Sequence, residues 1–290
     1  MPLSVLALVL ASAIIHATWN LWLKQLGPSV RSGPLMWVLT ALSSLLFAPV
    51  ALWMIAHGSW RPTPIAIGFI LASGAIHVVY FLLLLRGYRV GDLSLVYPVA
   101  RGTGPMLAFI GAVVLMGERA SLMSVSGALL IVLGVVVLTW QRDGVAQARL
   151  GPGLRYGLAI GVSIAVYLLW DGWAVKRLLV PPLVYYWGGE VTRVLLFTPA
   201  ALADRAGVTA LWREHRWRMI GIAVLSPFSY ILILLALRSG PISHIAPARE
   251  ISILLGAYLG GRVLGEGQRR RRLVAAGAFA AGVIALALAR

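Results

Sequence analysis

Runs of about twenty apolar residues follow one another along the whole of this 290-residue chain. A helix of that length crosses the roughly 30 Å hydrocarbon core of a bilayer. The runs lack the alternation of apolar and polar positions that marks the roughly ten-residue strands of a membrane barrel. The pattern therefore predicts an all-α membrane protein with ten transmembrane helices, at residues 3–23, 34–56, 64–85, 93–116, 121–140, 153–175, 182–203, 218–237, 243–264 and 271–289.

Polar residues inside this pattern occur twice at a constant separation. Arg101 lies seventeen residues before Glu118, and Arg249 lies seventeen residues before Glu266 (118 − 101 = 266 − 249 = 17). Both members of the second pair are displaced by 148 positions from the first (249 − 101 = 266 − 118 = 148). A repeated charge inside an apolar segment indicates a duplicated membrane protein.

The duplication divides the chain into halves of five spans each. Trp-Asn-Leu-Trp at 19–22 matches Trp-Asp-Gly-Trp at 170–173, and a polar stretch separates the fifth and sixth spans. Because five is odd, the second half must enter the membrane from the opposite side, which predicts two inverted five-helix repeats around a central cavity. The predicted boundaries are 1–141 for the first repeat, 142–152 for the loop and 153–290 for the second repeat.

Composition agrees with a chain that lies mostly in lipid. Hydrophobic residues make up 60% and charged residues 12%, with a mean hydropathy of +0.89, whereas a soluble domain carries about 25% charged residues. The net charge of +16 comes from Lys and Arg spread over short loops, so we do not expect nucleic-acid binding. Without cysteine, a metal-ligand cluster, a P-loop or a nucleophile elbow, the sequence predicts no enzyme activity, no metal and no cofactor.

The basic residues also bear on orientation. Sixteen of the 25 Lys and Arg residues lie in odd-numbered loops and six in even-numbered loops and termini, which leaves Arg101, Arg193 and Arg249 inside spans. The positive-inside rule then places both termini outside the cytoplasm. The first span lacks a positively charged leader, so we expect it to be retained rather than cleaved as a signal.

The start of the fourth span is unusual for a helix. Residues 97–105 read Tyr-Pro-Val-Ala-Arg-Gly-Thr-Gly-Pro, and proline removes a backbone donor and clashes with the preceding turn. We expect unwound backbone here, which at membrane depth is tolerated where it is buried in protein or lines a cavity. Pro247 and Arg249 repeat the feature in the ninth span. The expected substrate-binding residues at these breaks are Tyr97, Arg101, Gly102, Thr103 and Arg249.

Two readings of these arginines remain open. A charge at mid-bilayer costs at least about 2.5 to 3.5 kcal/mol, so Arg101 and Arg249 are candidates to attract a carboxylate or another anionic group. Alternatively, each guanidinium bonds carbonyls freed at the break, or reaches a membrane face along its apolar stem.

Asp171 is the only acidic residue of its span, and its counterpart in the first half is Asn20. An intramembrane carboxylate is a candidate proton or ion site. We expect Asp171, His16 and His77 to take part in proton or ion coupling. Lys176 follows one turn later, so a salt bridge with Asp171 is the alternative.

The seventh span carries two opposite charges. Glu190 and Arg193 are three positions apart, hence on one helix face, and are expected to form a structural ion pair. The alternative is a charge pair at the cavity wall. Polar and aromatic side chains of other spans complete the expected substrate site, with an interfacial tryptophan belt as the alternative for the indoles. These residues are Trp19, Asn20, Tyr80, Trp170 and Trp187.

Together, His-Ala-Thr-Trp-Asn-Leu-Trp-Leu-Lys at 16–24, the 97–105 motif and the Gly-Glu pair after the fourth span of each half resemble the EamA-type family of the drug/metabolite transporter superfamily. The resemblance covers nearly the whole chain. It implies an inverted-repeat bundle that works by alternating access on amino acids or other small metabolites, often as an exporter. It also implies cytoplasmic termini, which contradicts the charge distribution. Ala-Pro-Ala-Arg-Glu at 246–250 departs from the glycine-rich motif of the first half.

The sequence thus predicts a secondary transporter that exports a small polar or zwitterionic, amino-acid-like metabolite across a bacterial inner membrane. Efflux of lipophilic or cationic drugs, with Asp171, Glu190 and Glu250 as the site, is the alternative. A non-transporting scaffold or lipid-binding subunit is a further one. Expected partners are a small-molecule substrate, membrane lipids and a second copy of the chain packed through small-residue helix faces, but no nucleic acid.

Overall fold

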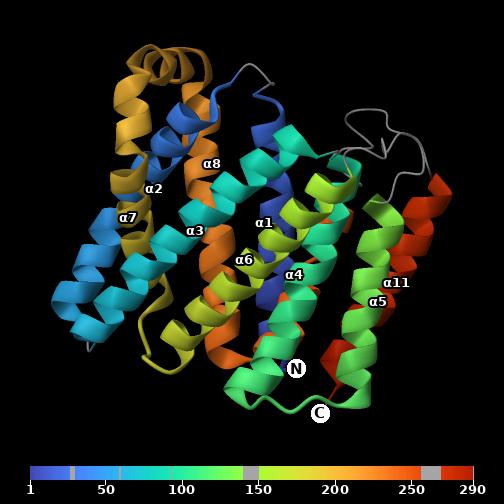
Figure 1. Ribbon diagram of the computed structural model, residues 1–290. Coiled ribbons are helices and arrows are strands. Elements are labelled where there is room, and N and C mark those ends of the chain that lie inside the picture. Colours follow the sequence, from blue (N-terminus) through green and yellow to red (C-terminus); the bar gives the residue numbers. More distant parts are fainter. Residues whose placement is uncertain (27–29, 59, 92, 140–149, 256–268, 290) are drawn as a thin grey trace.

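The computed structural model describes residues 1–26, 30–58, 60–91, 93–139, 150–255 and 269–289, which are almost entirely helical (Figure 1). The helices are α1 (Leu3–Lys24), α2 (Ser32–His57), α3 (Pro64–Val90), α4 (Leu93–Met116), α5 (Leu122–Thr139), α6 (Leu150–Lys176), α7 (Pro182–Ala203), α8 (Arg205–Ser239), α9 (Ile242–Ala248) and α11 (Arg269–Leu288). Residues 251–255 are also helical. Most predicted spans agree with these helices within a few residues.

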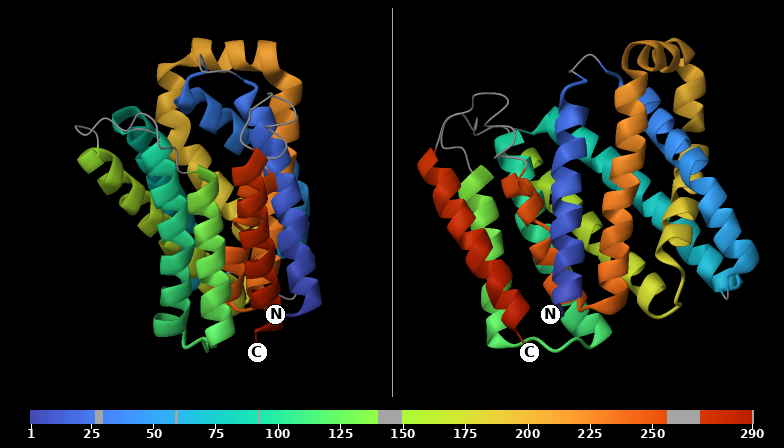
Figure 2. Two further views of the ribbon diagram at one scale, coloured as in Figure 1. Left: turned by 90° about the vertical axis from the view of Figure 1, so that its right-hand side faces the viewer. Right: turned by 180° about the vertical axis from the view of Figure 1, so that it is seen from behind.

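The helices form a bundle in which segments of the two halves of the chain pack on one another. α1 packs against α8, α2 against α7, α3 against α6 and α5 against α11, while α4 lies along α6. Figure 1 shows α3 and α6 crossing the front, and the view from behind in Figure 2 shows α1 and α8 running side by side there. Both termini lie at the same end of the bundle, where the amino group of Met1 donates to the carbonyl of Ala287 at 2.9 Å.

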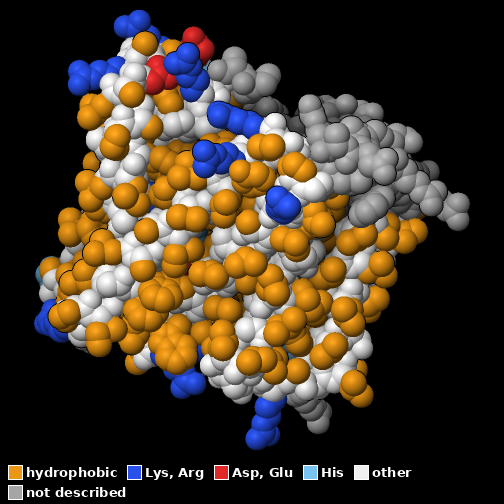
Figure 3. Space-filling model, viewed as in Figure 1, with side chains coloured by type: hydrophobic (Ala, Val, Ile, Leu, Met, Phe, Trp, Pro, Cys, Tyr) orange, Lys and Arg blue, Asp and Glu red, His pale blue; other side chains and the backbone are white. Residues whose placement is uncertain are grey.

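The outer surface is apolar. Large hydrophobic side chains are widely exposed, such as Leu122 at 88% and Val114 at 72%, and in Figure 3 they cover the flank while most lysines and arginines gather toward the two ends. Within the described residues, six helices are long and apolar enough to cross a membrane, and 122–137 and 273–288 are shorter apolar helices. A surface of this kind is stable in lipid rather than in water.

The prediction of unwound backbone at the start of the fourth span was wrong. α4 is helical throughout, with Pro98 and Pro105 inside it. The glycines serve close packing instead: a Cβ on Gly104 would lie 2.9 Å from the Cβ of Ile164, and one on Gly161 of α6 would overlap the Thr103 hydroxyl. Small residues that let two backbones approach are common between membrane helices, so the motif belongs to the contact between α4 and α6.

The interruption expected in the ninth span is present. α9 ends at Ala248, Arg249 and Glu250 form a turn, and helix resumes at 251. Pro247 cannot donate to the carbonyl of Ser243, which weakens the helix at this point. Residues 256–268, which include the second Gly-Glu pair, lie outside the described residues.

The eighth span begins earlier than predicted. α8 starts at Arg205 rather than near 218, and its first turns run across the upper end of the bundle in Figure 1. Asp204 caps this segment by accepting a hydrogen bond from the Gly207 amide at 3.0 Å. The segment carries Arg213 and Arg216 between apolar residues, so an apolarity-based prediction omits it.

Candidate functional site

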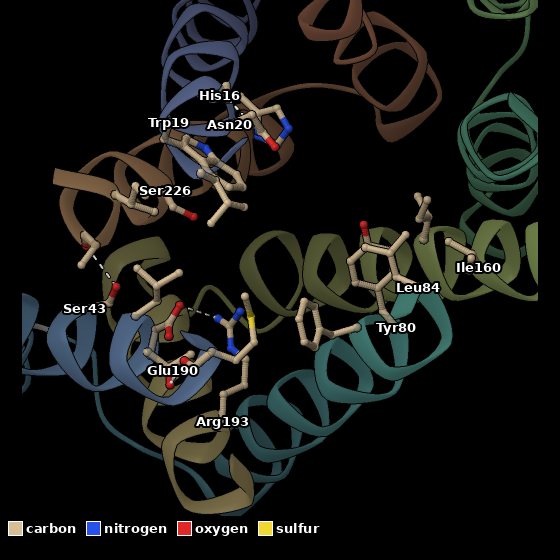
Figure 4. A pocket seen from close by; sticks show the side chains of 18 of the residues that line it. His16, Trp19, Asn20, Ser43, Tyr80, Leu84, Ile160, Glu190, Arg193 and Ser226 are labelled. Atoms are coloured by element: carbon tan, nitrogen blue, oxygen red, sulfur yellow. Dashed lines mark hydrogen bonds and ion pairs between the residues drawn. The ribbon is translucent and has the colours of Figure 1, made fainter. Parts of the chain in front are cut away.

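A cavity of about 390 Å³, with charged and polar side chains in a largely apolar wall, lies between the two halves. Helices of both halves supply its wall, and Figure 4 shows their side chains pointing into the hollow from several directions. Its polar and aromatic lining consists of His16, Trp19, Asn20, Thr40, Ser43, Tyr80, Phe81, Tyr88, Tyr97, Arg101, Tyr186, Glu190, Arg193 and Ser226.

A second cavity of about 150 Å³ adjoins the first, since seven residues line both. These shared residues are His16, Trp19, Tyr80, Arg101, Tyr186, Arg193 and Ser226. The smaller cavity adds His77, Tyr167, Ser229, Tyr230 and Arg249. The two cavities together form the candidate site.

The larger cavity extends toward the end of the bundle at which α1 is connected to α2, α3 to α4 and α7 to α8, here called the odd-connection end. Leu23 lies one residue before the end of α1, Tyr88 two before the end of α3, and Met36 near the start of α2, and all three line this cavity. The smaller cavity contains residues from the middle of the helices instead, such as His77 and Tyr230. The site therefore deepens from the odd-connection end toward the centre of the bundle.

Arg101 is neutralised by the other half of the chain. Its Nη1 lies 3.5 Å from Oε1 of Glu250, and its guanidinium lies 5.6 Å from the centre of the Tyr97 ring. Both charged side chains are largely buried, at 18% and 4% exposure. Glu250 follows Arg249 in the chain yet pairs with Arg101, so this contact could not be predicted from neighbouring residues.

Arg249 has different surroundings. Its Nη1 lies 3.4 Å from the Tyr167 hydroxyl, and its guanidinium lies 5.1 Å from the centre of the Tyr230 ring. Within the part of the chain that the structure describes, no carboxylate lies within ion-pair distance of Arg249. It is therefore the cavity arginine that has no ion pair of its own among the described residues.

Glu190 and Arg193 form the predicted ion pair, at 2.9 Å, and both line the larger cavity. The Arg193 guanidinium also lies 5.2 Å from the centre of the Tyr186 ring. The second oxygen of Glu190, Oε2, is buried and accepts no hydrogen bond among the described residues. The pair thus has a structural contact and a place in the cavity wall, so both interpretations of the sequence apply.

Asp171 is fully buried beside the smaller cavity and is held by hydroxyl groups of three other helices. Ser73 and Tyr185 donate to its Oδ1, each at 2.7 Å, and Tyr230 donates to its Oδ2 at 2.6 Å. Nε2 of His77 lies 3.9 Å from Oδ2. Hydroxyl donors of this kind stabilise a carboxylate without neutralising it.

The alternative prediction of a salt bridge between Asp171 and Lys176 was wrong. Lys176 lies 3.4 Å from Oε1 of Glu118 and donates to the Gly240 carbonyl at 3.0 Å. Asp171 and Lys176 lie in different surroundings on α6. Asp171 is fully buried, whereas Lys176 lies in the last turn and keeps 35% of its side chain exposed.

The two predicted histidines both line the smaller cavity. His16 packs edge-on against Trp19, with ring centres 4.9 Å apart, and its carbonyl accepts from Asn20 at 2.7 Å. His77 stacks near Tyr167, and its Nδ1 lies 2.9 Å from the Ser73 carbonyl. Because a carbonyl only accepts, Nδ1 carries the proton, and Nε2 is the nitrogen that faces Asp171.

Four predicted site residues lie elsewhere. The indole of Trp170 donates to the Phe69 carbonyl at 2.9 Å and that of Trp187 to the Ser44 carbonyl at 3.0 Å, so both join neighbouring helices. Thr103 donates to the carbonyl of Val99, and Gly102 faces α5, so neither lines the described cavities. The placement of Gly102 and Thr103 reflects the unbroken helix α4.

Several site residues were missed by the sequence reasoning. Ser73 and Ser43 carry no motif, and their partners lie 98 and 180 positions away. The one available signal was helical spacing: Ser73 and His77, and Ser226 and Tyr230, are four apart and thus share a helix face.

At the opposite, even-connection end, where α2 is connected to α3, α4 to α5, α6 to α7 and α8 to α9, Glu118 joins the two halves. Gly117 ends α4 with a positive φ of 71°, and the following Glu118 accepts from the amides of Ile242 and Ser243 at 2.8 and 2.9 Å and from the Ser243 hydroxyl at 2.8 Å. Burial raises the pKa of Glu118, but these hydrogen bonds and Lys176 outweigh it and hold the pKa below its usual value. Glu118 therefore caps the start of α9.

A bundle of apolar helices around a buried, charged and aromatic cavity defines an integral membrane protein with an interior suited to a small solute. The model of the EamA-like transporter family matches residues 3–140. The matched family is part of the drug/metabolite transporter superfamily, and the match over the first half of the chain points to a transporter rather than an enzyme.

The fold has solved relatives. One crystal structure of a protein superposes with a TM-score of 0.77 over 98% of each chain, at 17% sequence identity. This likeness concerns the fold alone. No curated protein matches the chain.

Proposed function

We propose that the protein is a secondary transporter that exports a small zwitterionic, amino-acid-like metabolite from a bacterial cell by alternating access. The observation that carries this proposal is the cavity between the halves, because it offers both signs of charge beside aromatic surface. A zwitterion needs a cation for its carboxylate and an acceptor for its ammonium group. Arg249 supplies the first, and the free Oε2 of Glu190 supplies the second.

The packing of the helices supports an inverted repeat. If α1 corresponds to α6 and α3 to α8, a two-fold axis exchanges the contact of α1 with α8 and the contact of α6 with α3. The contact of α2 with α7 maps onto itself, as do those of α4 with α9 and of α5 with α11. This is the pattern expected of repeats at 1–141 and 153–290 around a shared central site.

The structure changes the expected role of the arginines. Arg101 joins the halves through Glu250, so its removal would strand a buried carboxylate, whereas Arg249 lacks such a partner. We therefore assign the substrate's acid group to Arg249. The indole N–H of Trp19, buried without a described acceptor and lining both cavities, is a further donor for the substrate.

Closure at one end supports alternating access. The larger cavity extends toward the odd-connection end, while Glu118 holds α9 to the loop after α4 at the other end. Loss of the Glu118 contacts, together with closure of the odd-connection end, would expose the site on the opposite side. Export can then follow the substrate's own outward gradient, and Asp171 is the proposed residue at which transport is coupled to a proton.

Counterflow in proteoliposomes tests this proposal. Vesicles loaded with a mixture of the twenty amino acids should accumulate labelled amino acids from outside, and empty protein-free vesicles should not. Arg249→Gln should reduce this exchange by at least about tenfold, since one charge-assisted contact contributes about 1.5 to 3 kcal/mol.

The matched control is the double variant Arg101→Gln with Glu250→Gln, which removes one buried pair without stranding a charge. It should retain exchange if Arg249 is the anchor. Absence of exchange in the native protein, with efflux of a cationic dye instead, would support the drug-efflux alternative. Folded protein that moves neither solute would support the scaffold alternative.

A further inference from the structure

The charged groups around the two cavities are balanced only if Asp171 is ionised. Arg101 pairs with Glu250 and Arg193 with Glu190. Among the described residues this leaves Arg249 without an ion pair, and Asp171 with only the His77 ring within ion-pair distance, at 3.9 Å. Unbalanced charge in a low-dielectric interior is costly. A proton on Asp171 therefore leaves one positive charge for an incoming anion to compensate.

A single side chain connects these two groups. The hydroxyl of Tyr230 donates to Oδ2 of Asp171 at 2.6 Å, and the face of the same ring lies 5.1 Å from the Arg249 guanidinium. Tyr230 also lines the smaller cavity, together with Arg249. A ligand held at Arg249 would thus lie beside the residue that bonds Asp171.

The two oxygens of Asp171 are not equivalent. Oδ1 already accepts from Ser73 and Tyr185, whereas Oδ2 accepts from Tyr230 and lies 3.9 Å from His77. An added proton therefore belongs on Oδ2. A phenol has one proton to donate, so protonated Oδ2 would become the donor and Tyr230 the acceptor, which frees the phenolic O–H for another partner.

We propose that Tyr230 links protonation of Asp171 to the binding of a carboxylate at Arg249, so that a proton and the substrate's acid group bind together. The proton moves from cavity water to Oδ2, and no other bond changes. The freed O–H of Tyr230 then donates to the ligand's carboxylate beside the guanidinium. This inference rests on the proposed function and specifies how its site recognises a carboxylate.

Other groups around Asp171 do not offer the same connection. Tyr185 is 1% exposed and lines neither cavity, and Arg193 attracts the carboxylate from α7 while it holds Glu190. His77 faces both Oδ2 and the smaller cavity, which suits it to pass the proton. The charged or titratable groups that face Asp171 are thus His77 from α3, Tyr185 and Arg193 from α7, and Tyr230 from α8.

The test measures how pH changes the affinity of the purified protein for 3-phenylpropionate. Its amide, 3-phenylpropionamide, has the same shape without the charge. A carboxylate stays ionised between about pH 6 and about pH 8, so any change in affinity reports the protein. Calorimetry in two buffers of different ionisation enthalpy counts the protons taken up on binding.

The expected result is tighter binding of the acid at lower pH, by up to about tenfold per pH unit, with proton uptake. The amide should bind weakly and without pH dependence. Tyr230→Phe should bind the acid without pH dependence. Tyr185→Phe, which also removes one hydrogen bond from Asp171, should keep the direction of the pH effect. Asp171→Asn should bind at all pH values as the native protein does at low pH.

The inference is overturned if the native protein binds the acid equally at both pH values, binds it more weakly at low pH, or if Tyr230→Phe and Tyr185→Phe behave alike. It is also overturned if amino acids exchange in proteoliposomes while 3-phenylpropionate fails to bind, and in that case the transport proposal stands. If neither occurs, the proposed function fails as well.

Discussion

At the scale of single residues, a serine compensates for a proline in the wall of the cavity. Pro227 lies inside α8 and has no N–H for the carbonyl of Ala223, four residues earlier. The hydroxyl of Ser43 on α2 donates to that carbonyl at 3.0 Å. The next residue, Ser44, has a buried hydroxyl with no partner among the described residues.

This pair of serines gives a matched prediction. Ser43→Ala should lower the free energy of unfolding by about 0.5 to 1.5 kcal/mol, because a buried carbonyl loses its donor. Ser44→Ala should be neutral or stabilising, since it removes a hydroxyl that makes no hydrogen bond. Unfolding in mixed micelles measures both. Equal losses in the two variants would show that the Ser43 hydrogen bond contributes nothing specific.

At the scale of helices, two glycines of α4 test whether the motif at 97–105 serves helix packing or substrate binding. A Cβ on Gly104 would lie 2.9 Å from that of Ile164, whereas a Cβ on Gly102 would lie 3.6 Å from Val132, an ordinary contact. Gly104→Ala should therefore cost about 1 to 3 kcal/mol of stability through overpacking. Gly102→Ala should be tolerated or slightly stabilising, because alanine favours helix. Thermal unfolding compares them, and a large loss from Gly102→Ala would instead support the unwound segment that the sequence suggested.

The contact between Glu118 and α9 predicts a pH effect at the even-connection end. Because the pKa of Glu118 is lowered in the folded protein, its contribution to stability is present above its unfolded pKa of about 4.3 and is lost as pH falls through the folded value. Glu118→Gln should lower the melting temperature near neutral pH and weaken the further loss below about pH 4.3. Glu214→Gln, at an exposed carboxylate, is the control. Parallel acid profiles for native protein and Glu118→Gln would contradict this role.

The positions of the spans and of the buried charges could be predicted from the sequence, whereas the contacts between helices could not. Span positions follow from apolar length, and so they agree with the helices. α4 is continuously helical and packs closely against α6, and this packing cannot be inferred from the residue types at 97–105 alone. The partners of Asp171 lie 98, 14 and 59 positions away, so helical spacing pointed to Lys176 instead. The charges were identifiable from sequence, whereas their pairing depended on packing between helices.

At the scale of the whole molecule, the distribution of charge and the direction of the cavity bear on the same question. The larger cavity extends toward the end that holds the odd-numbered connections, where the sequence places sixteen of its 25 Lys and Arg residues. The positive-inside rule predicts that this end faces the cytoplasm. The structure would then have its site open to the cytoplasm, as an exporter must to load its substrate.

Cysteine labelling distinguishes this orientation from the cytoplasmic termini implied by the family resemblance. The native chain has no cysteine, so Leu23→Cys in the cavity and Arg119→Cys in the loop after α4 each give a single reactive thiol. A membrane-impermeant maleimide should label Leu23→Cys in inside-out vesicles and Arg119→Cys in right-side-out vesicles. The reverse pattern would place the termini in the cytoplasm and the cavity mouth outside. Excess substrate should also reduce labelling of Leu23→Cys, because the substrate and the reagent enter through the same opening, whereas Arg119→Cys should not be protected.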